Sequence, residues 1–131
     1  MKKFVEDWLA YADEDLIAAD VLNDNSLTNA VAFHCQQAIE KYFKAFLIEN
    51  DILFPRIHNL IRLYGMIQEV KDLEIDDEKL DVINGVYTNT RYPGEFGLMP
   101  DALPSHEQAK DFIEFAQKVK TIIRAALGVS G

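Results

Sequence analysis

Residues 105–128, SHEQAKDFIEFAQKVKTIIRAALG, carry the clearest helical pattern in the sequence. Ser105 and Gln108 have the spacing of a capping box, in which the two side chains bind free backbone N–H groups at the start of a helix. Apolar residues then recur every three or four positions, which places them on one helical face. Gly128 marks the end of the pattern. The apolar residues are Ala109, Phe112, Ile113, Ala116, Val119, Ile123 and Ala126.

Four more stretches show the same periodicity, so most of the chain is predicted to be helical. They cover about residues 3–23, 27–50, 58–70 and 76–90, with Asp76 as the expected N-cap of the last. No stretch of any length has the pattern of a strand. Amphipathic helices joined by short turns pack against one another as a bundle. We therefore predict an all-α fold: an antiparallel up-down helical bundle of four long helices plus one short helix, forming a single domain over residues 1–131.

The composition narrows the class of protein. The chain has 131 residues, 49% of them hydrophobic, which is enough for one full core. No apolar run approaches the roughly 18 residues of a membrane span, and the first residues lack the apolar stretch of a signal peptide. The one cysteine, Cys35, cannot form an internal disulfide. We expect a cytoplasmic protein with no membrane segment.

The formal net charge of −9 argues against broad binding to nucleic acid backbones. The charge is unevenly distributed, however. Residues 1–25 carry two basic and seven acidic groups, whereas residues 34–62 carry four basic and three acidic groups. Because charges separated by more than about 8 Å are largely screened at physiological salt, an acidic protein can still contain a local basic pocket.

The helix predicted over residues 27–50 carries a polar row on the side away from its apolar face. This row has two interpretations. It can be a solvated face, in which Glu40 and Lys44 form an i,i+4 pair. It can also be a set of ammonium and amide groups that line a groove for phosphate or for an acidic partner. The row consists of His34, Gln37, Lys41 and Lys44.

Asp15 lies on the flank of the apolar face of the first predicted helix, between Ala12 and Ala19. In one interpretation its carboxylate is half buried and needs a cation or a hydrogen-bond donor. In the other, it leans out into water. The candidate partners are Lys41, Lys44 and Arg91.

His58 and Arg62 are four residues apart, so they share a face of the short helix. A single histidine in this position can form a hydrogen bond at the helix start or pack its ring against the core. Alternatively, it can contact a ligand or act as a general acid or base. The sequence leaves both roles open.

A long loop, TNTRYPGEFGLMPDALPSH over residues 88–106, interrupts the run of helices. Pro93 prevents the preceding helix from continuing, and Arg91 favours the negative end of the helix dipole. These roles do not explain Tyr92 or the other apolar residues of the loop, and loops of this length are usually functional or mobile. We expect the loop to fold back over the helix at 27–50 and bring Arg91 and Tyr92 towards Lys41, Lys44 and His58.

Motifs for metal binding and for covalent catalysis are missing from the sequence. The three histidines fall on separate predicted elements, and there is no HxxxH, HExxH or CxxC pattern. There is no glycine-rich phosphate loop after a strand, and Ser105 is explained as a cap. We therefore expect no metal and no cofactor, and we assign no catalytic residue.

In their order along the chain, four segments resemble the HEPN domain family. They are WLAYADEDLIAAD at 8–20, AFHCQQAIEKYFKAFLIEN at 32–50, IHNL at 57–60 and NTRYPG at 89–94. The resemblance implies a helical bundle that forms a homodimer and binds nucleotide or RNA. It also implies pairing with a minimal nucleotidyltransferase in a toxin–antitoxin or defence module. Carried over by position, the family's polar residues are Asp15, Gln37, Lys41, Lys44, His58, Arg91 and Tyr92.

One family feature is missing. Many HEPN proteins are metal-independent ribonucleases with an Arg-x4–6-His motif, whose arginine stabilises charge on the phosphate and whose histidine moves protons. No arginine of this chain has a histidine five to seven positions downstream. We therefore predict a binding module that is not an enzyme.

Two alternatives remain open. The protein can be a divergent ribonuclease that uses Arg91 with His58 or His106. It can also be a structural protein that assembles through its helices, with Ile17 and Val21 as exposed apolar contacts outside the main stripe of the first helix.

Overall fold

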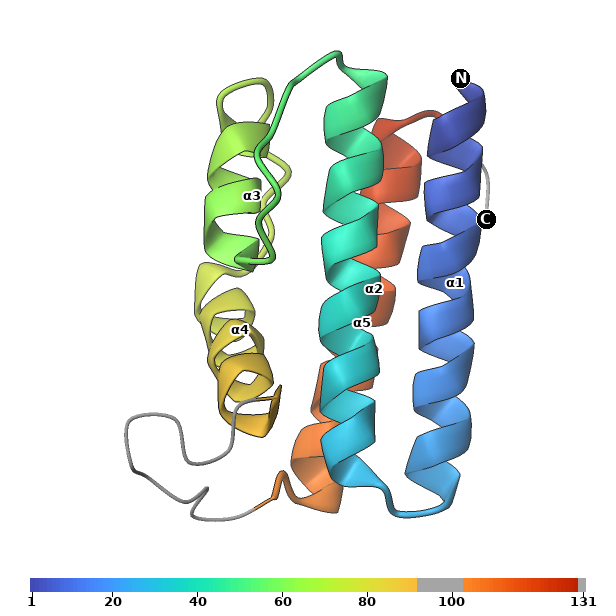
Figure 1. Cartoon of the computed structure of the whole chain (residues 1–131), viewed down its shortest axis with the longest axis vertical. Coiled ribbons are helices and arrows are strands. Elements are labelled where there is room, and N and C mark those ends of the chain that lie inside the picture. Colours follow the sequence, from blue (N-terminus) through green and yellow to red (C-terminus); the bar gives the residue numbers. More distant parts are fainter. Residues whose placement is uncertain (92–102, 130–131) are drawn as a thin grey trace.

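The computed structural model describes residues 1–91 and 103–129, and it describes side chains for residues 1–85 and 103–129. The predicted all-α fold is confirmed, since the described residues form helices and no strand (Figure 1). The helices are α1 (Lys3–Asp24), α2 (Thr28–Glu49), α3 (Leu60–Gln68), α4 (Asp77–Arg91) and α5 (His106–Ala126).

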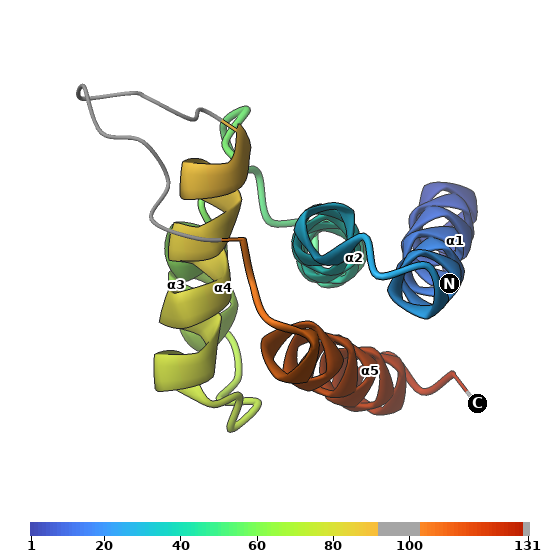
Figure 2. The same ribbon diagram turned by 90° about the horizontal axis from the view of Figure 1, so that it is seen from below.

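Three long helices, α1, α2 and α5, lie side by side and form a triangle when seen end-on (Figure 2). The shorter α3 and α4 follow one another along the side of α2 and α5 that faces away from α1 (Figures 1 and 2). The chain runs down α1, up α2, down α4 and up α5 (Figure 1). This alternation is the predicted up-down order of the four longer helices.

Side-chain caps mark the starts of α3, α4 and α5. Ser105 and Gln108 form the predicted capping box, with Ser105 Oγ accepting from the Gln108 N–H at 3.1 Å. Asp76 caps α4 as predicted, because its Oδ1 accepts from the N–H groups of Glu78 and Lys79 at 3.0 and 3.1 Å. The short α3 begins later than predicted, because the Asn59 side chain accepts from the N–H groups of its first turn.

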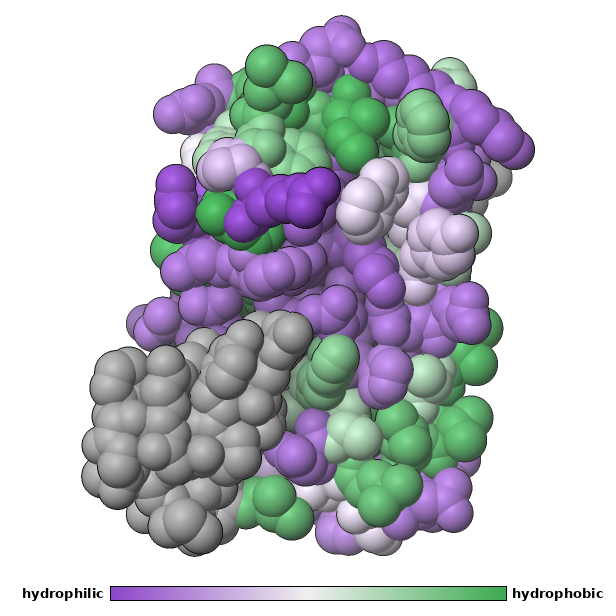
Figure 3. Space-filling model, viewed as in Figure 1, coloured by the Kyte–Doolittle hydropathy of each residue, from purple (hydrophilic) through white to green (hydrophobic). Residues whose placement is uncertain are grey.

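The central helix is α2, which contacts each of the other four helices. An element surrounded in this way buries more than one stripe of its surface. Its buried residues therefore include the polar side chains of Gln36, Glu40 and Lys44. On the face where α2 is nearest the viewer, a band of hydrophilic side chains crosses the middle of the molecule, with hydrophobic patches above and below it (Figure 3).

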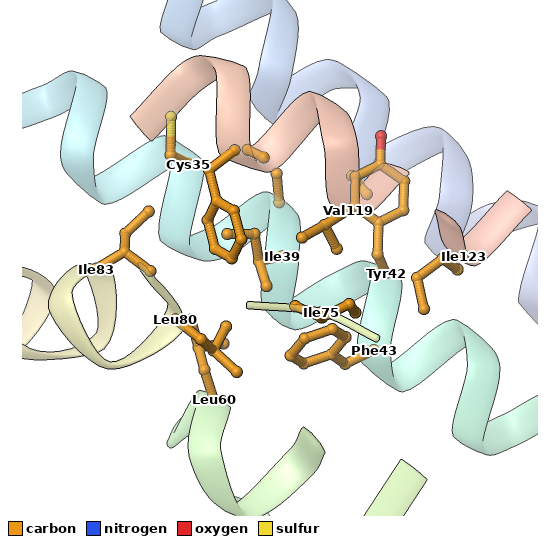
Figure 4. Close-up of a cluster of buried hydrophobic side chains, with 14 of the residues drawn as sticks. Cys35, Ile39, Tyr42, Phe43, Leu60, Ile75, Leu80, Ile83, Val119 and Ile123 are labelled. Atoms are coloured by element: carbon orange, nitrogen blue, oxygen red, sulfur yellow. The ribbon is translucent and has the colours of Figure 1, made fainter. Parts of the chain in front are cut away.

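The core is centred on the apolar side chains of α2. Ile39 and Phe43 point between residues of α3 and α4 on one side and of α5 on the other (Figure 4). Both side chains are fully buried, and the Phe43 ring is stacked on Tyr64 of α3 with 5.7 Å between ring centroids. Burial of side chains of this size contributes about 1.5–3 kcal/mol each, so these contacts help to hold α3 and α4 against α2.

Asp13 on α1 accepts hydrogen bonds from side chains of α2 and α5. One carboxylate oxygen accepts from the Tyr42 hydroxyl at 2.5 Å, and the other accepts from Arg124 Nη2 at 2.5 Å. Tyr42 is fully buried, and this burial, together with the hydrogen bond to Asp13, raises the pKa of its hydroxyl well above the usual value of 10.0. The hydroxyl therefore remains a hydrogen-bond donor to Asp13, which explains how a polar group is accommodated inside the core.

Two further predictions concern the surface. Ile17 and Val21 are exposed as expected, at 65% and 55%. Among the residues with described positions, no helix combines the length and the apolar character needed to cross a membrane.

Candidate functional site

Asp15 is buried on α1 and binds two residues of α2. Its Oδ2 accepts from Lys41 Nζ at 2.6 Å, and its Oδ1 lies 2.9 Å from His34 Nδ1. Its side chain is only 11% exposed, against 26% for Lys41 and 34% for His34. The interpretation that Asp15 needs a cationic partner is confirmed, and Lys41 is such a partner; the side chain of Arg91, another candidate, lies outside the described residues. His34 is a second partner, which was not among the predicted candidates.

Glu40 forms a second polar centre on α2, towards the C-terminal end of the helix. Its Oε2 accepts from Lys44 Nζ at 2.9 Å and lies 3.0 Å from His58 Nδ1. The side chains of Glu40 and Lys44 are 5% and 9% exposed, whereas His58 is 60% exposed. His58, just before α3, therefore joins a buried ion pair to the surface.

The Lys44 ammonium is enclosed by aromatic rings as well as by Glu40. It lies 5.9 Å from the centroid of Trp8 on α1 and 5.7 Å from that of Phe54 in the connection after α2. Rings at this distance attract a cation through their negative faces. The interpretation of the whole row as a solvated face is therefore wrong for Lys44, because the connection that follows α2 and the start of α1 cover this part of the helix.

Two glutamines lie between the two polar centres. Gln36 is fully buried, and its Nε2 donates to the backbone carbonyl of His58 at 3.1 Å. Gln37 Nε2 donates to Gln36 Oε1 at 2.9 Å. Gln36 and Glu40 were not among the predicted site residues. Gln36, Glu40 and Lys44 follow one another at intervals of four residues, which places them in a second polar row beside the first. This spacing is the feature of the sequence that could have indicated them.

The network neutralises the two lysines that were predicted to attract phosphate. Lys41 is paired with Asp15, and Lys44 with Glu40, at distances of 2.6 and 2.9 Å. The predicted i,i+4 pair of Glu40 and Lys44 is therefore confirmed, and the hypothesis that the row lines a groove for phosphate stays a prediction. A lysine ammonium has three N–H donors, however, so the partly exposed Lys41 can bind Asp15 and a ligand oxygen at the same time.

Both histidines of the site are oriented by a carboxylate. His34 Nδ1 faces Asp15, and His58 Nδ1 faces Glu40. When Nδ1 carries the proton and donates to the carboxylate, Nε2 is left as an acceptor or a base. The arrangement can therefore hold a ligand hydroxyl or, at His58, accept a proton from one.

The other chemical groups of the described residues offer less. No cluster of three or more His, Cys, Asp or Glu side chains is placed to hold a metal ion in the part of the chain that the structure covers. Cys35 is buried, and burial next to Asp20 and Asp15 raises the pKa of its thiol to about 12. A thiol with this pKa stays protonated at neutral pH and is a poor nucleophile.

The predicted site is thus brought together in part. The hydrogen bonds form two groups along α2: Asp15 with Lys41, and Gln37 with Lys44 and His58 through Gln36 and Glu40. Arg91 is the last residue of α4. Its side chain and the whole of Tyr92, with the loop that follows, lie outside the described residues, so their approach to the site stays a prediction.

Comparisons with known proteins agree with this fold. A model of the HEPN domain family matches residues 5–126. A curated protein of Methanocaldococcus jannaschii, named as a candidate toxin, is 27% identical over 135 residues, which cover 93% of this chain and 87% of that protein.

Two solved structures share the arrangement of helices. The crystal structure of TT1696 from Thermus thermophilus has a TM-score of 0.79 at 21% identity, covering 95% of this chain and 98% of that one. The crystal structure of ST0689, described as an archaeal HEPN homologue, has a TM-score of 0.70 at 21% identity, with 96% and 98% covered. At this identity they show a shared fold.

Proposed function

The chain belongs to the HEPN domain family, and from this premise we propose that it is a non-catalytic module, a single domain over residues 1–131, that binds a nucleotide or a short RNA. The proposed site is the polar surface of α2 with Asp15, Gln37, Lys41, Lys44 and His58, completed by Arg91 and Tyr92. The similarity to a candidate toxin supports a role in a toxin–antitoxin module. A minimal nucleotidyltransferase as partner and a homodimer in the cytoplasm are parts of the same proposal.

The observation that carries the proposal is the buried network on the central helix. Glu40 and Lys44 are 5% and 9% exposed, and Gln36 is fully buried. A buried ion pair usually adds little to the stability of a protein, because replacing it with apolar residues of similar volume often leaves the protein as stable or more stable. A connected polar network at the middle of a bundle is therefore better explained by a site that needs oriented polar groups.

The charge of this surface limits the size of its ligand. Both lysines of the network are paired with carboxylates, and the chain carries a net charge of −9. Binding of long nucleic acid depends on many phosphate contacts with unpaired cations. The proposed ligand is therefore as small as one nucleotide or a few, held by directed hydrogen bonds from Lys41, Gln37 and the two histidines.

Substitution of Lys41 tests the binding proposal. Lys41→Gln keeps an N–H donor for Asp15 but removes the charge, so adenosine 5′-monophosphate is expected to bind about tenfold more weakly, as for the loss of one charge-assisted hydrogen bond. Arg91→Ala is expected to weaken binding similarly. Isothermal titration calorimetry measures both. The matched control is Lys118→Gln, an exposed lysine of α5, which should bind as the unmodified protein does. Equal affinity in all four proteins would remove the proposed site.

The orientation of His58 favours one second candidate, a metal-independent ribonuclease. Its ring is 60% exposed and is held through Nδ1 by buried Glu40. Nε2 could then take the proton of a ribose 2′-hydroxyl as its oxygen attacks the adjacent phosphorus. The 5′-oxygen leaves with a proton donated by water, and the charge that develops on the phosphate requires a cation such as Arg91.

Incubation of the pure protein with RNA and EDTA separates the two functions. For a binding module we expect intact RNA. Cleavage that falls at least about 100-fold in His58→Ala would instead establish the enzyme, since general acid–base catalysis contributes about 10²–10⁴-fold. His106→Ala is the matched variant, because His106 is an exposed histidine at the start of α5. Loss of cleavage in that variant alone would assign the proton transfer to His106.

A further inference from the structure

We propose that Tyr11 on α1 is the platform on which the base of a bound nucleotide stacks, with Trp8 on its flank and the phosphate directed towards Lys41. This inference rests on the proposed function and adds the part of the ligand that the polar network does not explain. It makes the ligand a single nucleotide recognised through its base as well as through its phosphate.

Tyr11 lies between two contacts that join α1 to α2. Trp8, three residues before it, is in contact with Lys44, and Asp15, four residues after it, binds Lys41 and His34. Residues three and four apart share one face of a helix, so the three side chains form one line beside the polar row of α2. One helical turn, about 5.4 Å, separates Tyr11 from the Asp15–Lys41 pair, a span that a ribose can bridge between base and phosphate.

The exposure of Tyr11 distinguishes it from the other aromatic residues. Its side chain is 59% exposed, and the only other strongly exposed Phe, Tyr or Trp among the described side chains is Phe4, at 71% on the same helix. A tyrosine can present its ring to solvent with little loss of conformational entropy, and every nucleobase has a flat face that stacks on such a ring. The position next to the polar network, more than exposure alone, is what points to a ligand.

The surrounding charge favours one nucleotide over a strand. Asp7 and Glu14 are exposed and lie four residues before and three residues after Tyr11. At this spacing the Cβ atoms of helical neighbours are about 5–6 Å apart, which is within the Debye length of about 8 Å, so salt screens the two carboxylates from this position only in part. A second phosphate running along α1 would meet both carboxylates. The base can stack without this repulsion because it is uncharged.

The chain contains one tryptophan, Trp8, which gives the experiment a built-in reporter. We would titrate the protein with adenosine 5′-monophosphate and with ribose 5-phosphate, following Trp8 fluorescence and the heat of binding. Stacking predicts that ribose 5-phosphate binds about tenfold more weakly than the nucleotide. Tyr11→Leu should remove this difference, while Tyr11→Phe should keep it. Phe4→Leu, two turns away on the same helix, is the control and should bind the nucleotide normally.

The outcomes separate the inference from the function on which it rests. Equal binding of both ligands in the unmodified protein, or unchanged nucleotide binding in Tyr11→Leu, would overturn the stacking platform and leave the phosphate site intact. No binding of either ligand would overturn the proposed function and the platform together. A difference that is lost in Tyr11→Leu and kept in Tyr11→Phe establishes the platform, because a merely structural role of Tyr11 would change the affinity for both ligands alike.

Discussion

Replacement of Glu40 by alanine is expected to lower the free energy of unfolding by about 3–5 kcal/mol, the range found when one partner of a buried ion pair is removed. The Lys44 amine would then lie at 9% exposure with no carboxylate in contact, since Glu40 is its one ion-pair partner among the described side chains. The rings of Trp8 and Phe54 recover part of this energy through cation–π attraction. Urea unfolding followed by circular dichroism measures the difference.

The matched control removes both charges together. In the double variant Glu40→Leu with Lys44→Met, the free energy of unfolding is expected to lie within about 1 kcal/mol of that of the unmodified protein. Apolar residues of similar volume can replace a buried ion pair with little change in stability. Gln36 keeps its hydrogen bond to the His58 carbonyl in this variant. A double variant as unstable as Glu40→Ala would show that the pair stabilises the fold. Recovery of stability with loss of nucleotide binding would support its role in the site.

Truncation of Phe43 is the second change with a large expected effect. The ring is fully buried on α2 and stacked on Tyr64, so Phe43→Ala leaves a cavity between α2 and α3 and removes an aromatic pair. We expect the free energy of unfolding to fall by about 3–5 kcal/mol, as for other buried phenylalanines. The free energy of unfolding of a small domain is about 5–15 kcal/mol, so this variant is expected to unfold at a much lower urea concentration than the unmodified protein.

Leu53→Ala is the control for this truncation, because Leu53 is 96% exposed. It should change the free energy of unfolding by no more than about 0.5 kcal/mol. If Phe43→Ala were as mild as Leu53→Ala, the Phe43 ring could not be packed between α2 and α3. The comparison tests the fold without any assumption about the ligand.

The periodicity of the apolar residues was sufficient to predict the helices and their order. The capping box at Ser105 and the cap at Asp76 were predicted correctly, because these motifs depend on residues three or fewer positions apart. The third helix is predicted to begin at about residue 58 and begins at Leu60. Its start is set by Asn59, whose side chain accepts from the N–H groups of Ile61 and Arg62, and the apolar periodicity alone does not mark this position.

The candidate site could be predicted only in part. Asp15 was recognised as a carboxylate in need of a partner, because its position on the flank of an apolar stripe is a local property. The choice of Lys41, and the participation of His34, depended on how α1 and α2 lie against each other. The interpretation of Lys44 as part of a solvated face is wrong, because Lys44 is buried between Glu40 and two aromatic rings.

Residues close together in the chain are enough to predict the all-α class, the approximate limits of five helices and the family, because helical periodicity, caps and ordered motifs are local patterns. The pairing of charges and the burial of polar groups follow from the packing of the helices. These properties depend on residues far apart in the chain, such as His58 and Glu40 or Arg124 and Asp13. A row of charged residues on one helix is buried where neighbouring helices cover it and exposed where they do not.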